Sequence, residues 1–391
     1  VIKQLEQFYT EQYGDNMTTS SEFEYKDFKQ KNERYITMLA KEFEMRKAAS
    51  KFAKAKTSST GDIDINKIYK YKLDDAIFKK VMRVPKGKSH GLILLLDKSG
   101  SMTENMAPSI EQILVLAFFC RKVNIPFTVY GFGNALDSYV IDKSLDASYA
   151  STRNLLQKQF KPIPGQLAMK PVFLREYLSS NMSSAEFQKS VKLMLLLRQS
   201  FEKRNRSYYA AIPPSESLSN TPLIESLFAS RKVIDEFRTR NNLDIVNLVV
   251  VHDGDADAIR HMYSDEVVDY DGLRTTHASP EMYNMYLIDR KNKFQIQYTD
   301  CYNSLRAATM QWLTKTTGAK VYGFFITGQG NRNMRNAVHN RSVDEELKRI
   351  EKIQDGWERN RQLDTWLDQK TKLLKKEKFL DCPTPGYDKF F

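Results

Sequence analysis

The feature that most constrains the fold is an apolar segment, residues 91–96, which ends in an aspartate and two serines. An uninterrupted apolar run of this kind is typical of a parallel β-strand that is buried on both faces. Asp97 then lies where the strand leaves the sheet, and Ser99 and Ser101 follow at alternate positions. Open α/β sheets bind ligands just outside the carboxyl ends of their strands. The segment therefore predicts an α/β fold with a polar site at the edge of the sheet.

The sequence that follows alternates between apolar strands and helices. We expect further strands at 126–132, 245–251 and 321–327, and helices at 109–123, 221–240 and 304–317. Residues 286–298 alternate in polarity around a turn and predict a hairpin. Strands that alternate with helices are typical of a mostly parallel sheet with helices on both faces. We therefore predict a Rossmann-like α/β domain.

Polar, helix-prone segments flank this domain and interrupt it. We expect a helical N-terminal extension at 1–86, the α/β domain at 87–330 and a helical C-terminal extension at 331–391. Within the domain, residues 135–218 separate the second strand from the next helix by far more than a usual connection. We interpret them as an inserted helical subdomain.

Both extensions carry apolar residues at helical spacing. Ser342 and Glu345 form a capping-box pattern at the start of the C-terminal helices. The C-terminal stripe more often packs on its own domain, and a partner surface is the alternative. The stripes are Tyr35, Met38, Leu39 and Phe43 in the N-terminal extension, and Ile350, Ile353, Trp357, Leu363, Trp366 and Leu367 in the C-terminal one.

Composition narrows the class of protein and of partner. The chain has 391 residues, of which 41% are hydrophobic and 28% charged, which supports a sizeable core and excludes wholesale disorder. A net charge of +12 favours an acidic partner. The sequence contains no zinc finger, RNA-binding signature or glycine-arginine repeat, so we do not expect specific nucleic-acid binding.

Cysteine usage and apolar runs bear on the compartment. Cys120, Cys301 and Cys382 are far apart and form neither a CxxC pair nor a disulfide framework. No apolar run approaches the roughly 20 residues of a membrane span, and no signal peptide is visible. We expect a cytoplasmic protein without membrane contact. Because the chain starts at Val1, we also expect a fragment or a processed chain.

Two later segments add oxygen ligands to the site after the first strand. Thr221 stands at the start of a helix and Asp253 follows a later apolar strand, so adjacent parallel strands would bring these oxygens into one crevice. Hydroxyl and carboxylate oxygens are hard ligands that suit Mg²⁺ or Mn²⁺. Waters would complete an octahedral site with one open position, which an acidic group of a partner could fill. The predicted metal ligands are Asp97, Ser99, Ser101, Thr221 and Asp253.

The order of these motifs resembles the metal-ion-dependent adhesion site of von Willebrand factor A domains. DxSxS after a buried strand, a threonine in a middle loop and Asp-Gly after a later strand carry that resemblance. Further segments resemble the CobT subunit of aerobic cobaltochelatase, in particular the CobT-like proteins of tailed bacteriophages. These segments are residues 41–44, 60–64, 70–72, 78–80, 87–92, 119–122 and 125–130.

The resemblance implies a von Willebrand factor A domain with Mg²⁺ or Mn²⁺ at its adhesion site. It also implies an adaptor rather than a catalytic subunit. CobT works with CobS, a ring-forming AAA+ ATPase of the MoxR type, in a chelatase complex. By this resemblance the partners are such an ATPase ring and an acidic protein ligand at the metal.

Two other functions fit the same residues. One is a phage virion structural or assembly protein that uses the A domain for adhesion, because a shared fold does not fix function. The other is a metal-dependent hydrolase with a general base near the metal. In that case His252, Asp257 and His261 could form a zinc site. His252 alternates away from Asp253 on a strand, however, which is more typical of a packed histidine.

Overall fold

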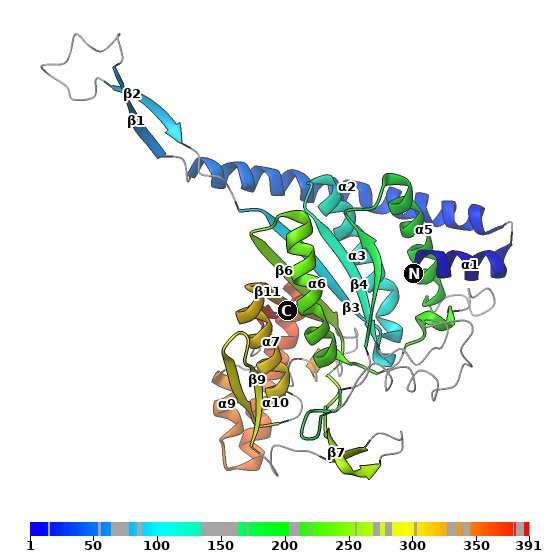
Figure 1. Ribbon diagram of the computed structural model, residues 1–391, viewed down its shortest axis with the longest axis vertical. Helices are drawn as coiled ribbons and strands as arrows, with labels where there is room; N and C mark the ends of the chain where they lie inside the picture. Colours follow the sequence, from blue (N-terminus) through cyan, green and yellow to red (C-terminus); the bar gives the residue numbers. More distant parts are fainter. Residues whose placement is uncertain are drawn as a thin grey trace, which may run out of the picture.

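A six-stranded sheet lies at the centre of the part of the chain that the computed structural model describes (Figure 1). The strands follow the order β12-β11-β6-β3-β4-β5, and every neighbouring pair is parallel except β4 and β5. When the six strands are renumbered 1–6 along the chain and the sheet is read from β5 to β12, the order is 3-2-1-4-5-6, as in doubly wound, Rossmann-like folds. The expected mostly parallel α/β sheet is confirmed. Its strands are β3 (His90–Asp97), β4 (Phe127–Gly133), β5 (Phe173–Ser179), β6 (Ile245–His252), β11 (Lys320–Phe325) and β12 (Lys389–Phe390).

The description covers most of residues 1–391. It leaves out 15, 54–55, 64–77, 84–87, 134–162, 170–171, 203–211, 219, 255, 269–273, 278–283, 301–302, 327–333, 336–337, 339–344, 378, 381–386 and 391. Within the described ranges, no helix is both long and apolar enough to cross a membrane.

Strand β3 shows why the sheet is covered on both faces. Ile93 and Leu95 belong to one apolar cluster, whereas Leu94 and Leu96 belong to another. Because successive side chains of a strand point to opposite faces, the continuous apolar run supplies two cores at once. All four side chains are at most 2% exposed.

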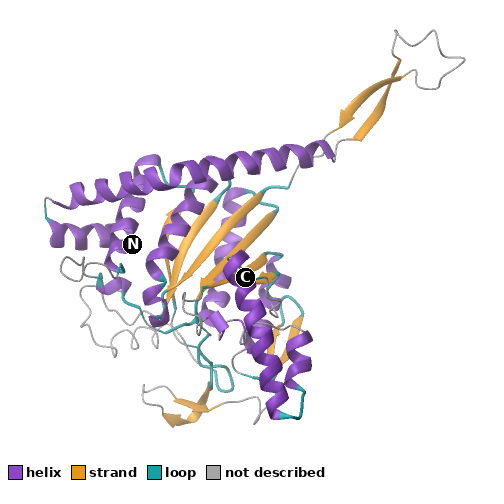
Figure 2. Ribbon diagram, turned by 180° about the vertical axis from the view of Figure 1, so that it is seen from behind, coloured by secondary structure: helices purple, strands orange, loops and turns teal. Residues whose placement is uncertain are grey.

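Helices form a layer on each face of the sheet (Figures 1 and 2). On one face, α3 (Met106–Lys122) and α5 (Ser184–Ser200) pack on the sheet, with α1 (Ile2–Tyr13) and α2 (Asn16–Ala53) outside them. On the other face lie α6 (Leu223–Asn241) and α7 (Asn303–Thr317). The helices expected at 109–123, 221–240 and 304–317 are therefore confirmed, with boundaries shifted by a few residues.

Smaller elements surround this body. After α2 comes a hairpin of β1 (Lys56–Ile63) and β2 (Phe78–Arg83), which extends away from the rest of the molecule (Figure 2). Two further hairpins are β7 (His261–Val268) with β8 (Arg274–His277), and β9 (Met285–Asp289) with β10 (Phe294–Tyr298). The last of these confirms the hairpin expected at 286–298. Near the C-terminus, α9 (Glu345–Glu351) packs on α10 (Gly356–Glu377).

The segment interpreted as an inserted helical subdomain is instead part of the main body where it is described. Its residues 173–179 form β5, the antiparallel edge strand of the central sheet. Its helix α5 contributes Val191, Leu195 and Leu196 to the main core. The sequence of β5 misled the prediction because it carries Arg175 and Glu176 inside the strand.

The apolar stripes of the extensions are confirmed only in part. Of the N-terminal stripe, Leu39 and Phe43 are half-buried, whereas Tyr35 and Met38 are exposed. Helix α2 instead buries Phe28, Ile36 and Ala40. In the C-terminal helices, Ile350, Trp366 and Leu367 join a small cluster of their own, and Trp357 is 72% exposed. The proposed capping residue Ser342 lies outside the described residues.

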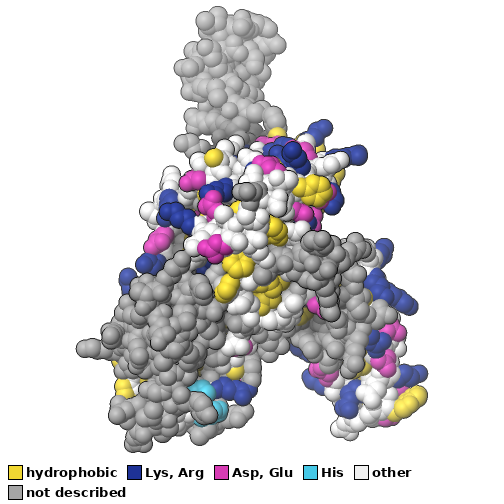
Figure 3. Space-filling view, turned by 90° about the vertical axis from the view of Figure 1, so that its right-hand side faces the viewer, with side chains coloured by type: hydrophobic (Ala, Val, Ile, Leu, Met, Phe, Trp, Pro, Cys, Tyr) yellow, Lys and Arg dark blue, Asp and Glu magenta, His cyan; other side chains and the backbone are white. Residues whose placement is uncertain are grey.

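Charged side chains of both signs are interspersed on the outer helices. Figure 3 shows this on the described surface beside α1 and α5, where basic and acidic side chains lie among one another. On α2, for example, Lys31 pairs with Asp27 and Arg46 with Glu42, both at 2.6 Å. Exposed pairs of this kind contribute little to stability, so they mainly keep the helix face solvated.

Candidate metal centre

The candidate site lies where the strand order of the sheet reverses direction. The first strand of the sheet, β3, pairs with β4 on one side and with β6 on the other. Ligands of open α/β sheets bind at such a switch point, beyond the carboxyl ends of the strands. Asp97 is the last residue of β3 and Asp253 follows the last residue of β6. The topology thus places both carboxylates in one crevice.

A chain of three short contacts joins the two aspartates. The Ser99 hydroxyl donates to Asp97 Oδ2 at 2.9 Å, and the Ser101 hydroxyl donates to Asp253 Oδ1 at 2.6 Å. The two hydroxyl oxygens are themselves 2.9 Å apart. The Ser99 amide also donates to Asp97 Oδ1 at 2.9 Å. Four of the five predicted ligands are therefore connected, in the order Asp97, Ser99, Ser101, Asp253.

Thr221 approaches the same crevice from the loop before α6. A methyl group built on Gly254 would come 3.3 Å from Ser101 Oγ and 3.9 Å from Thr221 Oγ1, so the glycine lies between the two hydroxyls. The Thr221 carbonyl accepts a hydrogen bond from the Asp257 amide at 2.9 Å, which joins its loop to the segment after β6. All five predicted residues thus come from three loops that meet at one edge of the sheet.

Burial dominates the electrostatics of Asp97. The side chain is inaccessible to solvent, and this burial raises its pKa from the usual 3.8 to about 7. The Ser99 hydroxyl acts in the opposite direction, and the charge of Asp253 again raises the pKa of Asp97. The donors to Asp97 in the hydrogen bonds above, the Ser99 hydroxyl and amide, are both neutral.

Counting protons shows what the cluster lacks when both aspartates are ionised. Three oxygen–oxygen contacts of 2.6–2.9 Å run from Asp97 through the two serines to Asp253. Each serine hydroxyl has one proton, and an ionised carboxylate only accepts. Two protons cannot serve all three contacts as hydrogen bonds, so a proton on either carboxylate or a bound cation would complete the cluster. The donor set of carboxylates and hydroxyls fits Mg²⁺ or Mn²⁺.

The structure also identifies a residue that the sequence analysis missed. The Asn105 side-chain amide donates to Asp253 Oδ2 at 2.9 Å, from the position directly before α3. It therefore leaves Asp253 Oδ1 to Ser101 and fixes the orientation of the carboxylate. The sequence signal was weak, because a polar residue before a helix is ordinarily interpreted as a cap.

The zinc site considered for a hydrolase is wrong. His252 is buried, its Nδ1 lies 2.9 Å from the Gly254 carbonyl oxygen, and its Nε2 lies 3.3 Å from the Tyr387 hydroxyl. His261 is on β7, where its ring meets that of His277. Among the described residues, no group of three or more His, Cys, Asp or Glu side chains is arranged to hold a metal. The cluster at Asp97 has only two carboxylates and relies on hydroxyls for its other oxygens.

Comparisons with known proteins identify no family. No family model matches the sequence, and no curated protein matches it. Among solved structures, the chain is similar to the pilus adhesin SpaC from Lactobacillus rhamnosus GG in its open conformation, with a TM-score of 0.33 and 9% identity. The alignment covers 75% of this chain and 31% of the adhesin. A similarity this distant carries no argument about function.

Proposed function

We propose that this chain is a von Willebrand factor A-type binding module that depends on Mg²⁺ or Mn²⁺. In this proposal it is a CobT-like adaptor for a MoxR/CobS-type AAA+ ATPase, and its metal binds a carboxylate of an acidic protein ligand. The observation that carries the proposal is the chain of contacts from Asp97 to Asp253 at the switch point of the sheet, because it gathers carboxylate and hydroxyl oxygens of the kind that bind Mg²⁺.

The predicted ligands would have different roles in binding a divalent cation. Asp97 and Asp253 would supply two negative charges, and Ser99, Ser101 and Thr221 would supply neutral oxygens. The cation, when bound, is a Lewis acid that attracts a further carboxylate. Asn105 would hold Asp253 in place from outside the ligand set, as residues around metal ligands commonly do.

Binding is favoured over catalysis by the state of His252. This residue is the nearest candidate for a general base in sequence, next to Asp253, yet it is buried and both of its ring nitrogens have partners. A general base must reach the proton that it abstracts. His252 instead packs between Tyr387 and Phe325, so its role is structural.

The ATPase partner is the part of the proposal that comes from the sequence resemblance. The net charge of +12 favours an acidic partner of any kind, because a basic protein associates faster with an acidic one. We therefore expect the adaptor to bind a MoxR-type ATPase, and the ATPase rate to change on binding.

The test has two measurements. Isothermal titration of the metal-free protein with MgCl₂ should show one binding event in the parent and none in Asp97→Ala. The matched control is Asp244→Ala, at the start of β6 and so at the opposite end of the sheet, which should bind like the parent. Co-purification with a MoxR-type ATPase should require Mg²⁺ and Asp97. Equal Mg²⁺ binding by all three proteins would disprove the metal site.

A further inference from the structure

A second carboxylate is buried beside the candidate metal centre. Glu216 is inaccessible to solvent and its two oxygens each contact a cation: Oε2 lies 2.8 Å from Lys98 Nζ, and Oε1 lies 2.8 Å from Arg175 Nη2. The Tyr177 hydroxyl also donates to Oε2. We refer to Lys98, Arg175, Tyr177 and Glu216 as the buried ion cluster. All four side chains are at most 8% exposed.

The buried ion cluster contacts two of the three loops of the metal centre. Lys98 stands between Asp97 and Ser99, and its ammonium group also donates to the Ser215 carbonyl at 3.1 Å. Glu216 belongs to the short helix η4 (Pro214–Glu216), five residues before Thr221. The Lys98–Glu216 ion pair therefore joins the DxSxS loop to the segment that leads to Thr221. The remaining members, Arg175 and Tyr177, come from β5.

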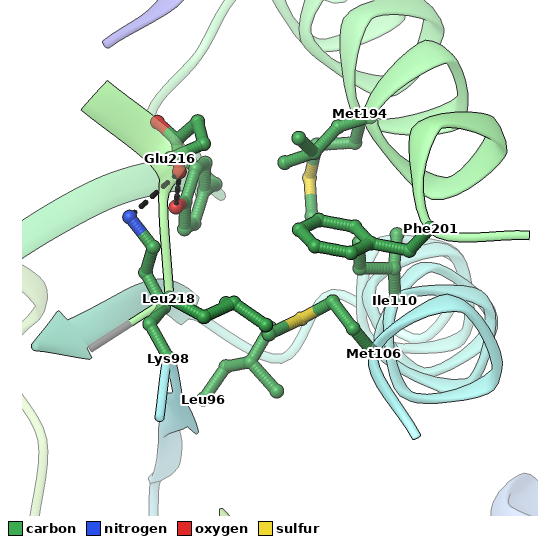
Figure 4. A pocket seen from close by; sticks show the side chains of 10 residues that line it. Leu96, Lys98, Met106, Ile110, Met194, Phe201, Glu216 and Leu218 are labelled. Atoms are coloured by element: carbon green, nitrogen blue, oxygen red, sulfur yellow. Dashed lines mark hydrogen bonds and ion pairs between the residues drawn. The ribbon is translucent and has the colours of Figure 1, made fainter. Parts of the chain in front are cut away.

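The surroundings of the cluster make this joint rigid. Figure 4 shows Lys98 and Glu216 meeting at one side of a small cavity, whose other side is formed by apolar residues of α3 and α5. An ion pair in apolar surroundings cannot exchange its partners for water without a large cost. The Lys98 side chain is thereby fixed at both ends, by its backbone at β3 and by Glu216.

Gly131 on β4 provides the space that this arrangement needs. A methyl group built there would lie 2.6 Å from Tyr177 Cε2 and 3.0 Å from Lys98 Cδ. Any side chain at this position would push the tyrosine ring or the lysine stem away from Glu216. The strand therefore needs glycine at the point where Lys98 and Tyr177 pass over it.

We infer that Glu216 is a positioning residue that holds the DxSxS loop and the Thr221 loop in register, without itself touching the metal. Its consequence for metal affinity rests on the proposed function. Ligands that must be ordered on binding give a weaker site, and residues that support metal ligands commonly change affinity about tenfold to a hundredfold.

The experiment compares Glu216→Gln with Glu24→Gln. Glu24 is a matched control because it also pairs with a buried arginine, Arg198, at 2.8 Å, but it joins α2 to α5. Hydrogen exchange of the metal-free proteins is measured at the amides of Ser99 and Leu223, which bond to Asp97 Oδ1 and to the Thr221 carbonyl. Titration with MgCl₂ gives the affinity of each protein.

We expect Glu216→Gln to speed exchange at both amides and to weaken Mg²⁺ binding about tenfold, since support of metal ligands has effects of this size. Glu24→Gln should leave both unchanged, even if it unfolds more easily. Tyr177→Phe and Gly131→Ala are the second variants in case Glu216→Gln does not fold, and both should change exchange in the same direction.

The outcomes separate this inference from the proposed function. Unchanged exchange at both amides in every folded variant of the buried ion cluster would overturn the inference. Faster exchange in these variants, when the parent binds no Mg²⁺, would support the positioning role while the proposed function fails. Faster exchange with unchanged Mg²⁺ affinity would overturn the consequence for the metal site.

Discussion

Two buried carboxylates in neighbouring parts of the fold are stabilised in opposite ways. Glu216 contacts two cations, Lys98 and Arg175, so its charge is balanced within the protein. Asp97 accepts hydrogen bonds from the hydroxyl and amide of Ser99, which carry no charge. Burial of a charge is costly unless it is paired, so the two sites have different requirements. Glu216 has counter-charges within the protein, whereas the neutral donors to Asp97 leave its charge to be balanced by a proton or a metal ion.

The largest effect should follow from removing the balanced carboxylate. Glu216→Ala would leave Lys98 and Arg175 buried without their shared partner, which we expect to lower the free energy of unfolding by about 3–5 kcal/mol. Asp97→Asn, in metal-free protein at pH 8, should instead leave stability unchanged or raise it, because it removes a buried charge. Urea denaturation of both variants in EDTA checks this. A similar loss of stability in both would erase the distinction between the two sites.

The sequence could reveal the part of this contrast that rests on local patterns, but not the part that rests on contacts between residues far apart in the chain. Asp97, Ser99 and Ser101 follow a run of apolar residues, and local pattern was enough to place them at the end of a buried strand. Asp253 and Thr221 were found in the same way, from a strand end and a helix start. The Asp97 side of the comparison was therefore predictable.

The buried ion cluster around Glu216 was not predictable, because none of its residues is a defining position of a recognisable sequence motif. Arg175 interrupts the apolar pattern of β5 and made that strand resemble a helix or loop, although its charge is balanced by Glu216 from a distant part of the chain. Tyr35 and Met38 show the converse, since they share the helical spacing of the apolar residues around them but lie on the exposed side of α2. Only the tertiary structure decides which charged residues find partners and which helix face is covered.

The second prediction uses pH to test the unbalanced carboxylate. Burial raises the pKa of Asp97 to about 7, above its value of 3.8 in an unfolded chain. The folded metal-free protein therefore binds one more proton than the unfolded chain between these values, and stability falls as pH rises through this window. We expect the loss to be on the order of 3 kcal/mol between pH 4 and pH 8.

The difference in unfolding free energy between the parent and Asp97→Asn, measured in EDTA across this range, isolates the contribution of Asp97. Asp244→Asn is the control, because the hydrogen bonds from Ser89 lower the pKa of Asp244 below its usual 3.8, so its contribution to stability should hardly change across this range. If the difference between the parent and the Asp97→Asn variant does not change with pH, Asp97 is ionised throughout and has another partner.

The third prediction supplies the missing cation. Mg²⁺ at a concentration 100 times its dissociation constant should stabilise the parent by about 2.7 kcal/mol. The gain should shrink below pH 7, because the ion then competes with the proton on Asp97. Thermal unfolding with and without MgCl₂ at pH 6 and pH 8 measures both effects. The Glu216→Gln variant should keep part of the stabilisation by Mg²⁺, and the Asp97→Asn variant should show none. Full stabilisation of Asp97→Asn by Mg²⁺ would mean that the ion binds elsewhere.

The smallest effect concerns Thr221, one of the three uncharged ligands. Thr221→Ala removes one hydroxyl beside Gly254 and leaves both aspartates, so the metal should bind about tenfold more weakly, or about 1.4 kcal/mol. The stability of the metal-free protein should hardly change. Thr221→Ser is the matched variant, since it keeps the hydroxyl and should bind Mg²⁺ like the parent. Because the Thr221 carbonyl already accepts from the Asp257 amide, the loop keeps its backbone contact in both variants. Equal calorimetric affinity for Thr221→Ala and the parent would mean that the unbalanced site is completed by Asp97, Ser99, Ser101 and Asp253 with water, and that the third loop only closes over it.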